Sequence, residues 1–129
     1  MAAAAPGHRT KVGRLKKRSQ FLAVAAANRR WTAPGLALQA RKAAEDGRAG
    51  ETIRTGFTAT KKIGNAVARN RARRRLRAAA DDVLRRERLT AAGPVDLVLI
   101  ARAGTAERPY DALKADFRQA LDRLGVAAR

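Results

Sequence analysis

The sequence contains no cysteine and a single histidine, so it offers neither a disulfide nor a thiolate metal site. The lack of cysteine fits a reducing compartment. The histidine, His8, lies in a stretch of small residues near Pro6 and Gly7, where nothing would fix the geometry that a general base needs. Histidine-based catalysis is therefore not indicated.

Long apolar runs are also missing. The longest run falls far short of the roughly 20 residues that a transmembrane helix requires. The first six residues resemble the start of a signal peptide only superficially, because no apolar core follows them and the chain turns basic at once. We therefore expect a cytoplasmic protein with no membrane partner.

Acidic residues are scarce relative to basic ones. The 129 residues include 29 Lys and Arg against 11 Asp and Glu, which gives a formal net charge of +18. Such an imbalance makes an acidic partner close to obligatory, and nucleic acid is the leading candidate. The length fits one domain with a modest core.

The charge is most concentrated in residues 61–77, which hold eight basic side chains and no acidic one. Helical spacing of about 100° per residue predicts one helix from about Ala66 to about Leu89, with a single apolar stripe formed by Leu76, Ala80, Val83 and Leu84. By the same helical spacing, basic residues surround the first two turns of this helix. We therefore expect the first half of the helix to project past the core and contact nucleic acid. The alternative is a solvated charged helix face, although such a face usually mixes signs.

The start of this helix is itself suited to anions. Gly64 permits a sharp turn, and Asn65 can cap the helix. The free amides and the positive dipole end favour phosphate there. The pattern Gly-x-x-x-x-Gly-Lys is absent, so a nucleotide-binding P-loop is not indicated.

The remaining elements follow from periodicity and turn signals. A short helix capped by Ser19 is expected through about Ala27, and strands are expected at about 36–41 and 52–61, paired as an antiparallel hairpin across the polar connection 43–50. The apolar run 95–101 suits the middle of a sheet, and a closing helix should run from Pro109 until Gly125 stops it. Trp31 can begin a strand or cover a core edge rather than stack on nucleic acid. These elements predict an α+β fold in one small domain.

The basic segment also resembles a known family. Residues 61–67, Arg69-Asn70-Arg71, Arg73-Arg74 and Arg77 are similar to the signature of the bacterial ribonuclease P protein subunit. The resemblance extends more weakly to Leu15-Lys16-Lys17 with Phe21, and to the strand and helix after Gly93-Pro94, so that it covers about residues 14–124. It implies the order α-β-β-(β)-α-β-α, a central, mostly antiparallel sheet packed by helices, and a basic crossover helix. The additional strand should come from residues near Trp31 or from a split second strand.

The small residues, Pro6, Gly7 and Gly13 predict a disordered basic tail at 1–13, and a short tail is expected at 126–129. The resemblance implies two RNA-binding surfaces on the domain at 14–125 between these tails. The surface for the catalytic RNA subunit would comprise Lys61, Lys62, Asn65, Arg69, Asn70, Arg71, Arg73, Arg74 and Arg77. The cleft for the single-stranded 5′ leader of precursor tRNA would comprise Arg14, Lys16, Lys17 and Phe21. Ala25 stands where many members have a second cleft aromatic. From patterning alone, Phe21 is equally well a core residue.

The resemblance further implies that the holoenzyme is an endoribonuclease that removes the 5′ leader, while the RNA subunit holds Mg²⁺ and performs the catalysis. No catalytic or metal-binding residue is expected in the protein, because the side chains of the consecutive residues Asp81 and Asp82 point in different directions on the expected helix. No protein partner is required. The alternative is a noncatalytic structural RNA-binding protein such as a ribosomal protein; a DNA architectural protein lacks the expected apolar wedge residues.

Overall fold

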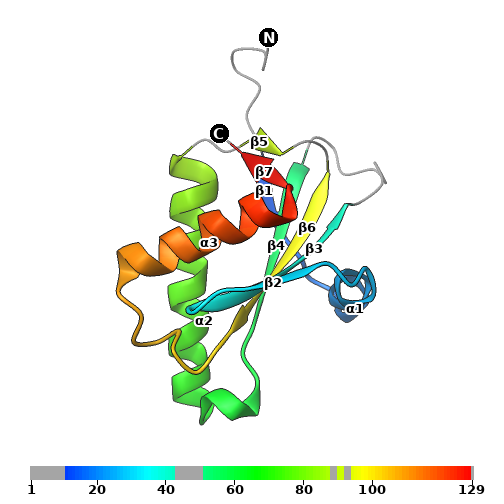
Figure 1. Ribbon diagram of the computed structural model, residues 1–129. Helices are drawn as coiled ribbons and strands as arrows, with labels where there is room; N and C mark the ends of the chain where they lie inside the picture. The colour runs from blue at the N-terminus through cyan, green and yellow to red at the C-terminus, as the bar shows by residue number, and fades with distance from the viewer. Residues whose placement is uncertain (1–10, 43–50, 88–89, 92–93, 129) are drawn as a thin grey trace.

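The computed structural model describes residues 11–42, 51–87, 90–91 and 94–128, in which helices cover both faces of a five-stranded sheet (Figure 1). The strands of this sheet are β1 (Lys11–Arg14), β2 (Arg30–Thr32), β3 (Leu36–Lys42), β4 (Glu51–Thr58) and β6 (Val95–Ala101). The helices are α1 (Arg18–Ala26), α2 (Ala66–Asp81) and α3 (Tyr110–Leu124). Two short strands, β5 (Thr90–Ala91) and β7 (Ala127–Ala128), pair with each other.

The five strands lie in the order β1-β4-β6-β3-β2, so that β6 occupies the centre as its apolar sequence predicts. β6 is parallel to β4 and antiparallel to β3; β1 is parallel to β4, and β2 is antiparallel to β3. Across the described chain three of the five strand pairings are antiparallel. The predicted α+β fold is confirmed, and β2 supplies the additional strand at Trp31.

The predicted hairpin between strands 36–41 and 52–61 is wrong, because β6 lies between β3 and β4 and pairs with both. The side chains of β6 are buried on both faces of the sheet, except that Ile100 is half-buried. A strand that is apolar on both faces gains most from a central position. The second strand also ends at Thr58, and Lys61–Ile63 instead form a short 3₁₀ turn.

Helix α2 begins where the sequence predicts. Gly64 has a φ of 140°, and the Asn65 side chain accepts a hydrogen bond of 2.9 Å from the Ala68 amide. The helix continues through a π-helical turn at Asp82–Arg86, whereas the predicted end at Leu89 lies outside the described residues. The predicted apolar stripe is confirmed, since Leu76, Ala80, Val83 and Leu84 are all buried, and Ala72 and Ala79 are buried beside them.

The other two helices differ from prediction only at their ends. Ser19 does not cap α1, because the helix starts at Arg18 and its N-cap position is Lys17, two residues before Ser19. The Gln20 side chain accepts from the Lys17 amide at 2.9 Å. This glutamine accepts from the Lys16 and Lys17 amides, which precede the first helical residue, whereas Ser19 was expected to accept from amides of the first helical turn. Helix α3 follows Pro109 and ends at Gly125, which adopts a left-handed φ of 66°.

The sheet separates two apolar clusters. The larger one lies between the sheet and helices α2 and α3, and Phe117 is its largest fully buried side chain. The smaller one lies beneath α1 on the opposite face and contains Leu15, Val24 and Val98, with Phe21 and Ile100 packed against it. Within the described residues, no helix is long and apolar enough to cross a bilayer.

Both predicted tails overlap the folded structure. Residues 11–13 belong to β1 and pair with β4, so the predicted boundary at residue 14 is wrong. At the other end Val126 is buried, and residues 127–128 form β7. Residues 1–10, including His8, and the connection 43–50 lie outside the described residues.

Candidate nucleic-acid interface

The turn that leads into α2 forms one end of the candidate interface. Lys61, Lys62 and Asn65 are exposed there, next to the first amides of the helix. Asn65 satisfies only the Ala68 amide through its side chain. The positive end of the helix dipole and the two lysines therefore act on the same small region, which suits a phosphate group.

The basic side chains in the first turns of α2 divide into two groups. Arg71 and Arg74 are exposed, whereas Arg69 and Arg73 are half-buried. Arg69 donates to the Gly64 carbonyl at 2.9 Å, and Arg73 donates to the Asn70 side chain. These local hydrogen bonds hold two arginines close to the helix surface, while Arg71 and Arg74 extend into solvent.

Arg75 has a structural role that the charge pattern does not reveal. Its guanidinium donates to the Ala106 carbonyl at 3.2 Å and to the Arg108 carbonyl. These bonds attach α2 to the loop that precedes α3. The RNA-binding surface expected from the sequence did not include Arg75.

Arg77 and Arg14 meet at one aromatic ring. Their guanidinium carbons lie 5.6 Å and 5.8 Å from the centroid of Phe57, which packs against the larger core. Both distances suit cation–π attraction. Arg14, which the resemblance assigns to the leader cleft, therefore lies on the α2 face of the sheet beside Arg77, on the opposite face from Phe21.

Phe21 occupies the α1 face and is half-buried. A Cβ atom built on Gly56 would lie 2.4 Å from Phe21 Cε2, which shows that the ring rests directly on the β4 backbone. The ring thus packs against the smaller cluster and keeps part of its surface accessible, so neither the core interpretation nor the cleft interpretation describes it alone. Lys16 and Lys17 are exposed at the start of α1, and Ala25 is exposed further along the helix.

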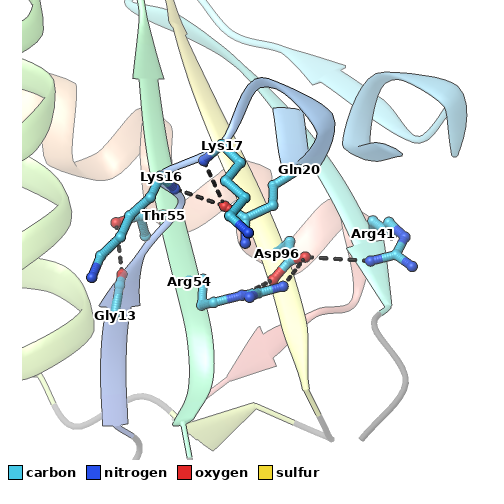
Figure 2. Close-up of polar contacts among 8 residues, drawn as sticks. All are labelled: Gly13, Lys16, Lys17, Gln20, Arg41, Arg54, Thr55 and Asp96. Atoms are coloured by element: carbon cyan, nitrogen blue, oxygen red, sulfur yellow. Dashed lines mark hydrogen bonds and ion pairs between the residues drawn. The ribbon is translucent and has the colours of Figure 1, made fainter. Parts of the chain in front are cut away.

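A row of charged residues that the sequence did not predict lies on the same face, and Figure 2 shows it beside the start of α1. Asp96 on β6 forms two 2.9 Å hydrogen bonds with Arg54 on β4 and one of 3.4 Å with Arg41 on β3. The available signal was an aspartate within an apolar strand whose pattern predicts burial on both faces. Its partners were not predictable, because β6 was not expected to separate β3 from β4.

The acidic pair Asp81-Asp82 has structural partners. Asp81 and Asp82 form ion pairs with the arginines four residues further along the helix. Asp82 also accepts a 2.6 Å hydrogen bond from the Tyr110 hydroxyl. Burial first, and then this hydrogen bond and the Asp82 charge, raise the pKa of Tyr110 to about 12. Among the described residues no three His, Cys, Asp or Glu side chains gather as a metal site would require.

Comparisons with known proteins point to one family. The family model described as Ribonuclease P matches residues 10–125. The chain is 49% identical over 116 residues to the ribonuclease P protein component of Paramagnetospirillum magneticum, covering 90% of this chain and 85% of that protein. It is 51% identical to the corresponding protein of Gluconacetobacter diazotrophicus, covering 88% and 91%. The solved RNase P protein of Staphylococcus aureus has the same fold, with a TM-score of 0.67 at 20% identity over 88% of this chain and 95% of that one.

Proposed function

The chain belongs to the ribonuclease P protein family, and we propose that it acts as the protein subunit that assists a catalytic RNA in removing the 5′ leader from precursor tRNA. Its RNA partners are then the catalytic RNA subunit and the precursor tRNA. The similarity to named ribonuclease P proteins over most of the chain does not favour the alternative of a ribosomal protein.

The observation that supports this role best is the exposure of Arg71 and Arg74 on the first turns of α2, next to the capped start of the helix. Arginine donors suit phosphate oxygens, and clustered arginines outside the core meet no acidic partner within residues 61–77. We assign the surface of Lys61, Lys62, Asn65, Arg69, Asn70, Arg71, Arg73, Arg74 and Arg77 to the catalytic RNA. We place Lys16, Lys17 and Phe21 at the leader, and we move Arg14 to the catalytic-RNA surface because of its contact with Phe57.

The chemistry is assigned to the RNA. Hydrolysis assisted by metal ions needs converging ligands, and among the described carboxylates Asp81, Asp82, Asp96 and Asp116 are instead engaged in ion pairs. In this proposal Mg²⁺ is held mainly by the RNA subunit, and the protein screens the repulsion between phosphates. The cytoplasm, where precursor tRNA is processed, is the proposed location.

The test is assembly with a catalytic RNA from a relative's ribonuclease P, measured as binding affinity over a range of salt concentrations and as cleavage of precursor tRNA. Arg71→Ala with Arg74→Ala should weaken assembly and reduce the slope of log K against log salt by about 0.7 to 0.9 for each phosphate that the protein no longer neutralises. Arg30→Ala, which removes an exposed charge on β2, is the control. If the wild type, the double variant and the Arg30→Ala control assemble with the same affinity and slope, α2 is not the RNA-binding surface.

A further inference from the structure

Three adjacent strands place their charged residues in one row on the α1 face of the sheet. Asp96 is the register partner of both Arg54 on β4 and Arg41 on β3. The three side chains therefore leave the sheet side by side, with the carboxylate between two guanidinium groups (Figure 2). The geometry comes from strand pairing and not from a flexible loop.

The exposure of the three side chains increases outward from the carboxylate. The side chain of Asp96 is 1% exposed, that of Arg54 is 17% exposed and that of Arg41 is 34% exposed. The Arg54 pair is bidentate, which fixes the plane of its guanidinium. The row has a net charge of +1, and its positive members are the more accessible ones.

The next row along the same face holds the leader-binding aromatic. Two residues further along β4 and β6 are Gly56 and Val98, which lie under Phe21. Side chains two residues apart on a strand share a face and lie about 7 Å apart. The charged row therefore adjoins Phe21. It also lies near Lys16 and Lys17, which are exposed just before α1 (Figure 2).

Folding alone does not account for a buried carboxylate at this position. Val98 and Ile100 occupy the following positions of the same strand face, so apolar side chains fit there. Replacing a buried ion pair by apolar residues is often neutral or stabilising, because desolvation of the charges offsets their attraction. An aspartate that orients two arginines beside an accessible aromatic ring has an evident use in binding.

We infer that Asp96 is a positioning residue of the leader site, which holds Arg41 and Arg54 in fixed orientations against single-stranded RNA. Planar guanidinium groups both bind phosphate and stack on unpaired bases, so a fixed pair extends the surface that Phe21 begins. The inference rests on the proposed function and adds three residues to it.

Asp96→Asn distinguishes two roles of the carboxylate, because the two roles predict opposite changes in RNA binding when a negative charge is removed from this face. If the carboxylate acts only through its charge, the variant binds precursor tRNA more tightly. If it positions the arginines, the preference of the holoenzyme for precursor over mature tRNA falls by about tenfold, as expected when a charge-assisted hydrogen bond is removed. Asp111→Asn is the matched control, since Asp111 is 97% exposed on α3.

Arg41 provides the second variant, because its partial exposure makes Arg41→Gln compatible with folding even if Asp96→Asn does not melt cooperatively. Arg41→Gln should lower the preference for precursor tRNA at least threefold. Arg41→Lys, which keeps the charge but not the planar guanidinium, should retain only part of the preference. In the Asp96→Asn background, Arg41→Gln should cause little further loss, because the two residues act together. An unchanged or increased preference in Asp96→Asn, or an unchanged preference in Arg41→Gln, overturns the inference. A wild-type holoenzyme without any precursor preference overturns the proposed leader site instead.

Discussion

The contact between Phe21 and Gly56 leads to a prediction about both folding and leader binding. A methyl group added at Gly56 would lie 2.4 Å and 2.6 Å from two carbons of the Phe21 ring. Carbon atoms normally approach to about 3.5–4.0 Å, so the ring or the helix must shift by roughly 1 Å. Since no left-handed φ is involved at Gly56, lack of space is the main penalty for Gly56→Ala.

We expect Gly56→Ala to lower the free energy of unfolding by about 1–3 kcal/mol, the usual cost of overpacking. Phe21→Ala should cost less than the about 3–5 kcal/mol of a fully buried phenylalanine, because the ring is half-buried. In the Phe21→Ala background the two closest contacts of the methyl group are removed and only Leu15 Cδ1, at 3.2 Å, stays close, so Gly56→Ala should cost less than it does in the wild type.

Urea denaturation of the wild type, the two single variants and the double variant measures this coupling. Gly104→Ala is the control, because its added methyl group would lie 3.7 Å from the Pro34 carbonyl oxygen, an ordinary contact. Both single variants should also bind precursor tRNA less selectively, by up to about 1–3 kcal/mol for the loss of base stacking, and toward the small end because Ala25 provides no second ring. An equal cost of Gly56→Ala with and without Phe21 would refute the packing argument.

Three further predictions concern the rest of the molecule. Arg75→Ala should lower the free energy of unfolding by about 1–3 kcal/mol, because it removes two hydrogen bonds to loop carbonyls, whereas Arg71→Ala should not; equal melting temperatures would contradict this division. The single tyrosine, Tyr110, should ionise with a pKa of about 12 in an ultraviolet titration, and Asp82→Asn should lower that pKa toward 10. Because the pKa is raised above its ordinary value on folding, the stability that it contributes is complete below pH 10 and decreases as pH rises to about 12. Finally, the net charge of +18 predicts that the isolated protein gains helix content and melting temperature with millimolar sulfate, and circular dichroism unchanged by sulfate would contradict this.

Local signals in the amino-acid sequence were enough to identify several elements. Spacing along α2 identified its buried stripe, and Gly64 with Asn65 identified its start, because turn geometry and capping depend on neighbouring residues. The apolar run of β6 predicted a central strand, because a strand whose consecutive residues are nearly all apolar must be covered on both faces. The concentration of basic residues in 61–77 likewise predicted a surface for a polyanion, although its contacts with RNA remain a prediction.

The meeting of distant residues, in contrast, became visible only in the folded chain. Strand order depends on pairing between segments far apart in the sequence, so pattern alone suggested a hairpin where β6 in fact separates β3 from β4. That single change in order brings Arg41, Asp96 and Arg54 into one row. Folding also places the loop before α3 within reach of Arg75, which donates hydrogen bonds to two carbonyls of that loop. The sequence did not reveal this role, because all arginines carry the same charge and differ only in the groups that the fold brings near them.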